Sequence, residues 1–345
     1  LWDEGFDSEE QKYVGSKWGK YLRAPKIFFK ILQKGKGKLV PLKEVAEIRR
    51  GFTTGADRWF YVLSITESLS TREIKQIAQN LAYKGNVKKL KYIQSGDSTK
   101  WLVEKEYLHP VIRNPNDYKS IFIDAKSVKD LVIFIPETRE KLKDKLIEKY
   151  ISHGEKKAYK MGKDRTIIPS KTETCSSRPY WYQLPDIKPA RLLWQKAFDI
   201  YHRHYLVSSS VLANQRFYLI YPKNDKDTEV IASFINSILV PMYIEFQRTI
   251  MGLGAIEATV EEAKQILVVD PKIIKPPIKQ KLLSTLNNLI KREIDTVFSE
   301  LGATSPEEVS LEKVKPDRRE LDKIIMGEIL GLTEEEQLEV YRAVI

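Results

Sequence analysis

Short runs of β-branched and aromatic residues recur between residues 58 and 222, bounded by turn-forming Pro, Gly, Asn or Asp. Such runs favour short strands. Helical patterns interrupt them near residues 70–83 and 137–151, and the polar stretch 152–178 indicates a long loop. We therefore predict an α+β fold with mixed or antiparallel sheets of short strands and packed helices. The predicted strands lie within 58–65, 120–123, 130–136, 178–184, 190–198, 203–210 and 215–222.

The two ends of the chain show helical spacing instead. Pro25 can begin a helix whose apolar residues run from Ile27 to Leu32. One helix is predicted at about 228–250, a long amphipathic one from Pro276 to about 301, and two acidic ones near 317–330 and 333–344. These patterns divide the chain into an N-terminal connecting segment (1–36), a central domain (37–272) and a C-terminal helical region (273–345).

The charge of the chain is large and unevenly distributed. The formal net charge is +11, and eleven basic residues face two acids between residues 17 and 50. Eleven more face five acids between 155 and 203, whereas thirteen acids face six bases from residue 295 onward. An excess of Lys and Arg favours polyanions, that is, nucleic acid, an anionic membrane surface or acidic proteins.

Cysteine content and hydropathy bear on the setting of the protein. The single cysteine, Cys175, cannot form an internal disulfide, so we expect a cytoplasmic setting. The longest apolar stretch, 233–244, is too short to span a membrane and is broken by Asn236 and Pro241, so we expect no membrane contact. The chain begins without methionine, and we expect it to be part of a longer protein.

A search for catalytic constellations finds only weak matches. His202 and His204 could supply half a metal site, but exposed polar strand positions are the commoner explanation. Asp124 and Lys126 give the best match to the acid-x-Lys step of magnesium nucleases, a step that other places in the chain fit equally well. Gly162 and Lys163 lack the following Ser or Thr of a phosphate-binding loop. We predict no catalytic, metal-binding or cofactor-binding residues in this chain.

The stretch "RRGFTTGADRWFYV" at 49–62 places a polar, arginine-led turn beside a cluster of aromatic side chains. Glycines on both sides of a Thr-Thr pair indicate a tight, exposed turn, led by two arginines and followed by three aromatics. Arginines can bind phosphates or guanine, and threonines can approach base edges. The alternative is a structural turn with solvated arginines.

Two blocks of sequence resemble one known family. "LVPLKEVAEIRRGFTTGADRWFYV" is similar to the start of the TaqI-like target recognition domain of adenine-specific DNA methyltransferases from bacterial restriction-modification systems. In it Gly51, Thr54 and Gly55 match, and Asp57 stands where Asn is usual. The segment 232–271 resembles the closing signature of that domain, and the segment 318–332 resembles the C-terminal helix of these enzymes. The matching positions of the closing signature are Asn236, Ser237, Gly252, Gly254, Asp270 and Pro271.

The resemblance implies sequence-specific recognition of double-stranded DNA by residues 37–272. It also implies an N-terminal methyltransferase domain of the same protein as partner, carrying S-adenosylmethionine and an Asn-Pro-Pro-Tyr motif. This chain has only Asn114-Pro115-Asn116-Asp117, so we expect the catalytic domain to lie outside it. We therefore expect no catalysis from this chain alone, while the parent protein would be an adenine-specific DNA methyltransferase or a type II restriction enzyme fused to one.

Candidate contacts with DNA come from both the turn and the basic segments. The predicted DNA-binding residues are Arg49, Arg50, Thr53, Thr54, Asp57, Lys160, Lys163, Arg165, Lys171, Arg178, Lys196 and Arg203. The glycines predicted to shape turns are Gly51, Gly55, Gly252 and Gly254.

Two other functions remain open from the sequence. A stand-alone specificity subunit of a restriction-modification complex uses similar domains, although normally two of them. A metal-dependent nuclease would need a motif that the sequence does not reveal.

Overall fold

The computed structural model describes residues 6–7, 12–13, 23–162, 165–247, 249–250 and 256–345. Its centre is a ten-stranded mixed sheet in the order β4-β16-β13-β15-β8-β10-β5-β6-β7, with β9 paired to β15. Neighbouring strands are antiparallel, except that β15 runs parallel to β8 and β9. The strands are β4 Ala46–Arg50, β5 Tyr61–Ser64, β6 Leu90–Gln94, β7 Lys100–Glu104, β8 Leu108–Ile112, β9 Phe122–Ile123, β10 Asp130–Ile133, β13 Ala190–Gln195, β15 His204–Ala213 and β16 Phe217–Pro222.

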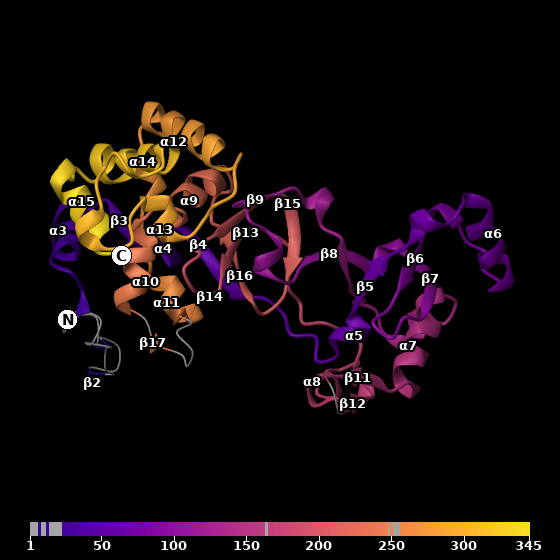
Figure 1. Ribbon diagram of the computed structural model, residues 1–345. Helices are drawn as coiled ribbons and strands as arrows, with labels where there is room; N and C mark the ends of the chain where they lie inside the picture. Colours follow the sequence, from indigo (N-terminus) through magenta and orange to yellow (C-terminus); the bar gives the residue numbers. More distant parts are fainter. Residues whose placement is uncertain (1–5, 8–11, 14–22, 163–164, 248, 251–255) are drawn as a thin grey trace.

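Helices gather at the two ends of this sheet (Figure 1). At one end lie α3 Lys26–Lys34, α9 Thr228–Ile235, α10 Leu239–Gln247, α11 Val260–Gln265, α12 Pro276–Leu289, α13 Val297–Leu301, α14 Pro316–Asp322, a π-helix Lys323–Ile329 and α15 Glu334–Arg342. Toward the other lie α5 Asp57–Phe60, α6 Thr71–Asn80, α7 Leu146–Lys156 and α8 Glu173–Ser176. The α+β class and the mixed sheet are confirmed.

Short strand pairs and one short α-helix accompany the large sheet. The helix α4, Leu42–Val45, follows β3 directly. The pairs are β1 Phe6–Asp7 with β2 Lys12–Tyr13, β3 Leu39–Pro41 with β19 Leu267–Val269, and β11 Tyr159–Met161 with β12 Arg165–Ile167. A three-stranded sheet joins β14 Ala197–Phe198, β18 Ile256–Glu257 and β17 Thr249–Ile250.

The middle of the sheet separates two large hydrophobic cores. In β13, Leu192 and Trp194 belong to the core shared with the C-terminal helices, whereas Leu193 belongs to the core beneath α5 and α7. Successive side chains of a strand point to opposite faces, so a strand that is apolar throughout can feed both cores. The first core continues from α3 through the sheet to α15.

The predicted helix at 228–250 is interrupted at Asn236, between α9 and α10. The side-chain oxygen of Asn236 accepts a hydrogen bond from the backbone N–H of His204 at 3.1 Å, and its amide nitrogen donates to the His204 carbonyl at 2.9 Å. Asp322 then accepts the N–H of Ile238. Tertiary partners of the backbone, rather than local propensity, therefore end α9 here.

Other expectations also needed correction. The residues 178–184 form turns rather than a strand, and Trp59 and Phe60 lie in the helix α5. The predicted polar loop 152–178 instead holds the end of α7, the strand pair β11–β12 and α8. The long helix predicted from Pro276 ends at Leu289.

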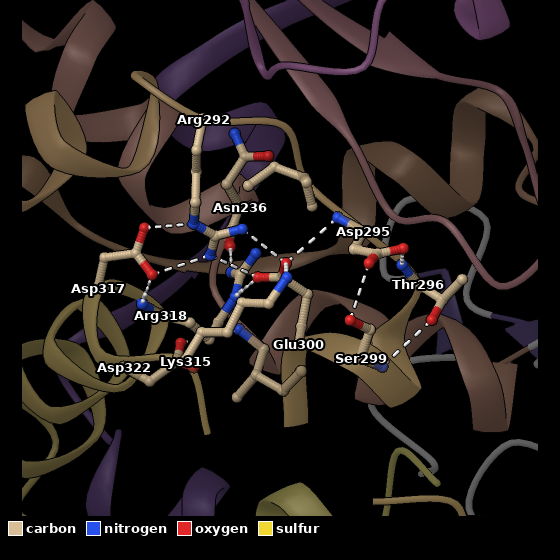
Figure 2. Close-up of polar contacts among 12 residues, drawn as sticks. Asn236, Arg292, Asp295, Thr296, Ser299, Glu300, Lys315, Asp317, Arg318 and Asp322 are labelled. Carbon is tan, nitrogen blue, oxygen red and sulfur yellow. Dashed lines mark hydrogen bonds and ion pairs between the residues drawn. The ribbon is translucent and has the colours of Figure 1, made fainter. Parts of the chain in front are cut away.

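An ionic cluster around the buried Glu300 fixes the segment that follows α12 (Figure 2). Arg292 donates two hydrogen bonds of 2.7 Å to Glu300 and bonds of 2.6 and 2.9 Å to Asp317. Lys315 donates to Glu300 at 2.9 Å, and Arg318 lies 3.5 Å from it while donating to the Asn236 carbonyl. This geometry requires a non-helical path between α12 and α13, and it ties both to α14.

Among the described residues, no single helix has the length and apolar composition needed to cross a membrane. The bent pair Asp225–Ile235 and Leu239–Phe246 meets that test by length and composition.

Candidate nucleic-acid interface

The turn between β4 and α5 contains two glycines, and each lies close to another segment of the same chain. A β-carbon at Gly51 would lie 2.0 Å from the carbonyl oxygen of Asn214, so no side chain fits there. Gly55 has φ of +76°, which strains any other residue, and a β-carbon there would lie 2.6 Å from that of Thr174. Both positions therefore shape the turn between Arg50 and α5.

Thr54 and Asp57 are engaged inside this turn. Thr54 is fully buried, its hydroxyl donates to the carboxylate of Asp57, and it accepts the N–H of Ala56 at 3.3 Å. The thiol of Cys175 donates to the Thr54 carbonyl at 3.4 Å, and burial raises the pKa of that thiol. The Thr54 side chain, predicted as a DNA contact, is thus buried and bonded within the turn in this structure. Asp57 is exposed but already accepts a hydrogen bond.

Arg178 connects the turn to the segment that carries α8. Its Nη2 donates to the carbonyls of Thr53 at 2.8 Å and Thr54 at 2.9 Å, and its guanidinium lies 5.4 Å from the centre of the Phe60 ring. Burial lowers its pKa from the ordinary value, yet an arginine keeps its charge. We predicted this residue as a DNA contact; in this structure its guanidinium clamps the turn.

The two arginines that lead into the turn are exposed at the edge strand β4. Arg49 forms an ion pair with Glu47 at 2.6 Å. The hydrogen bond to Glu47 and the negative charge of Glu47 both raise the pKa of Arg49. The side chain of Arg50 is exposed and makes no hydrogen bond or ion pair with any residue that the structure describes. Its five N–H donors are therefore available to a ligand.

A surface hollow of about 410 Å³ opens beside these arginines. Its lining includes Arg49, Arg50 and Thr53 from the turn and Thr174, Ser177 and Asp186 from residues 174–187. A second hollow, of about 430 Å³, adjoins it and shares Arg178, Pro185 and Asp186. The sequence reasoning missed Thr174, Ser177 and Asp186. Their segment meets the turn through the hydrogen bond from Arg178 to Thr53, and these two residues are 125 positions apart in the sequence.

The remaining candidates fall into three groups. Lys160, Arg165 and Lys171 are exposed on β11, β12 and the turn Pro169–Lys171 that leads to α8. Lys196 forms an ion pair with Glu257, and Arg203 is buried with its Nε donating to the Ile294 carbonyl at 3.0 Å. The structure therefore gives Arg203 a role in packing the C-terminal region. Three predicted residues, Lys163, Gly252 and Gly254, lie outside the described residues.

The two histidines are not the exposed strand residues that we expected. His204 stacks on Trp194 with 3.8 Å between ring centres, and His202 stacks on Phe198 at 5.1 Å. Burial lowers the pKa of His202 to about 4 and that of His204 well below its ordinary value, so both are neutral at pH 7. Within the described ranges, no group of three His, Cys, Asp or Glu could hold a metal ion. Asp124 caps a short turn and accepts a hydrogen bond from Ser208.

Residues 15–301 match the model of a protein family described as type II methyltransferase M.Eco57I, C-terminal domain. No curated protein matches the sequence. Similar solved structures include the type IIG restriction endonuclease BpuSI, with a TM-score of 0.47 and 11% identity over 92% of this chain. Another is the type IIL restriction-modification enzyme MmeI in complex with DNA, with a TM-score of 0.46 and 12% identity over 88% of this chain. The chain spans 34% of the BpuSI chain and 36% of the MmeI chain.

Proposed function

The chain belongs to the family of type II methyltransferase M.Eco57I C-terminal domains, as its motif blocks predicted, and from this premise we propose that it recognises specific sequences of double-stranded DNA. In this proposal it is the specificity part of an adenine-specific DNA methyltransferase of a restriction-modification system. The catalytic domain, which binds S-adenosylmethionine, is a separate part of the same protein. A methyltransferase must rotate its target base out of the duplex, so a second domain has to hold the DNA.

The observation that carries the proposal is Arg50, which lines the hollow, is exposed and has no side-chain partner among the described residues. It stands on a turn that Gly51 and Arg178 hold in one conformation. A guanidinium on a fixed loop can donate two hydrogen bonds to guanine O6 and N7, and the carboxylate of Asp186 could accept from a cytosine amino group. Hydroxyls of Thr53 and Ser177 add short polar groups that suit base edges.

Arg50→Ala tests whether this turn reads sequence. The substitution should narrow the affinity gap between cognate and scrambled duplexes by about 1–3 kcal/mol, the discrimination that one bidentate contact supplies. The target site would first be mapped from adenines methylated by the full-length protein, and competition binding would then measure the gap. The matched control is Arg49→Ala, since Arg49 already pairs with Glu47. This substitution should lower the affinity for cognate and scrambled duplexes by a similar factor and leave the gap unchanged.

Two results would count against the proposal. If the chain binds no duplex even at low salt, its role is not DNA recognition. If Arg50→Ala weakens cognate and scrambled DNA equally, Arg50 contacts phosphate and the turn does not read bases.

A further inference from the structure

The strand pair β11–β12, hereafter the ribbon, projects beyond the core that anchors it. Its register pairs Tyr159 with Ile167, Lys160 with Thr166 and Met161 with Arg165. At its base Tyr159 is 1% exposed and Ile167 packs against the core beneath α7. Two residues farther out, the side chains on both faces are exposed. The ribbon is therefore anchored at Tyr159 and Ile167 and exposed at Met161 and Arg165.

Met161 places an apolar side chain at this outer end. It is 37% exposed and is one of five large apolar side chains that the described surface exposes. Directly opposite residues of an antiparallel pair share one face, so Met161 lies beside the guanidinium-bearing Arg165. One exposed apolar residue is ordinary on a protein surface, and its surroundings decide what it means.

Those surroundings are strongly basic. Residues 156–171 contain six Lys or Arg and one acid. The five cations of this stretch that the structure describes are exposed and form no ion pair with other described residues; they are Lys156, Lys157, Lys160, Arg165 and Lys171. An apolar side chain within a field of unpaired cations suits a partner that offers phosphates outside and an apolar stack inside. Duplex DNA has this arrangement.

The position of the ribbon agrees with that partner. It leads through the turn Pro169–Lys171 into α8, whose Thr174 lines the hollow next to Arg50. Figure 1 shows α8, β11 and β12 grouped below α5. A two-stranded ribbon fits a DNA groove, and Met is one of the side chains that DNA-bending proteins insert between base steps.

We propose that the ribbon enters a groove of double-stranded DNA and that Met161 wedges between adjacent base pairs, while Lys160 and Arg165 contact the flanking phosphates. This inference rests on the proposed function, since it assumes that DNA binds on this face. It adds a deformation of the duplex, which makes the flexibility of the sequence under Met161 part of what is recognised. Met161 is thus a specificity-determining residue that makes no hydrogen bond to a base.

The test uses relaxed closed-circular plasmid, because insertion of a wedge unwinds the duplex whatever the target sequence. Plasmid is incubated with this chain and topoisomerase I, then deproteinised and resolved by electrophoresis. The unaltered chain should leave negative supercoils in proportion to the protein bound. Met161→Ala should lose this topological shift while still retarding the plasmid in a mobility-shift assay, and Met161→Leu should retain it.

A matched control is Leu63→Ala, which removes an exposed apolar side chain from β5, outside the ribbon, and should leave unwinding unchanged. Binding of plasmid without unwinding by the unaltered chain, or equal unwinding by Met161→Ala, would overturn the wedge and leave DNA recognition standing. Absence of plasmid binding at low salt would overturn both.

Discussion

The two arginines nearest the turn differ in what they contact, although both looked like DNA contacts in the sequence. The guanidinium of Arg50 makes no hydrogen bond with any described residue. The guanidinium of Arg178, in contrast, donates hydrogen bonds to the carbonyls of Thr53 and Thr54. The sequence shows only that both are basic and lie near polar residues. Which donors are already used depends on contacts between segments far apart in the chain, so this division could not be predicted.

Arg178→Ala should therefore lower the free energy of unfolding by about 1–3 kcal/mol, since it leaves the buried Thr54 carbonyl without its charged donor. Arg178→Lys should recover only part of the loss, because an ammonium cannot reproduce the planar fork. Urea unfolding followed by circular dichroism measures both variants. Arg50→Ala is the control and should change the unfolding free energy by less than about 0.5 kcal/mol. Equal stability of Arg178→Ala and the unaltered chain would contradict the clamp.

Among the elements, local patterns predicted the helices better than the points where they end. The apolar spacing around Ile231 and Ile235 correctly placed α9, because that face is buried in the core. The break at Asn236 depends on the backbone of His204, and no local propensity encodes that partner. Similarly, the segment 178–184 is aromatic enough for a strand, yet Tyr182 is buried in a turn beside Trp181. Sequence reasoning therefore located the turn of the candidate site and missed the elements that tertiary contacts bring to it.

The junction of α14 with the rest of the helical region carries two acids whose pKa values move in opposite directions. Burial raises the pKa of Asp322 to about 6, against the opposing charge of Arg318. Burial would also raise the pKa of Glu300, but hydrogen bonds from Arg292 and Lys315 and the charge of Arg318 lower it to about 2. In the unfolded chain both acids titrate near about 4.

The free energy of unfolding should rise as pH falls from about 6 to about 4, because the native state then binds a proton at Asp322 that the unfolded state does not. Below about 4 it should fall, because the unfolded state protonates Glu300 while the native state resists down to about 2. Asp322→Asn should flatten the upper slope, and urea unfolding at a series of pH values would measure it. The control is Asp144→Asn, at an exposed position, which should leave the dependence of the unfolding free energy on pH unchanged. If Asp322→Asn also left the slope between about pH 6 and 4 unchanged, the raised pKa would not belong to Asp322.

For the whole molecule, the pairing of cations differs between the region of the hollow and the ribbon and the C-terminal helices. The ribbon and the turn with Arg50 hold cations without described partners. Cations of the helical end are more often paired, as Lys281 is with Glu328 at 2.9 Å and Lys30 is with Glu339 at 3.4 Å. The basic segment 17–50 is divided by the fold, because Lys30 and Lys34 of α3 pair with Glu339 and Glu336 of α15, whereas Arg50 lines the hollow.

This difference in pairing predicts where salt dependence arises. If six to eight of the basic residues at positions 49–50 and 156–171 meet phosphates, each displaces counterions from the duplex, and the slope of log K against log salt should be roughly −5 to −7. Lys171→Ala should weaken binding to every duplex and make that slope shallower by about one unit, because a phosphate contact carries no base information. Fluorescence anisotropy of a labelled duplex at 50–200 mM salt, a range of roughly fourfold in concentration, measures the slope. Lys281→Ala is the matched control and should leave both affinity and slope unchanged, since its ammonium is paired with Glu328 and its helix, α12, lies away from β11 and β12 in Figure 1. The reverse pattern, with Lys281→Ala changing the slope and Lys171→Ala not, would move the DNA to the C-terminal helices and leave Arg50, Met161 and the hollow without a nucleic-acid partner.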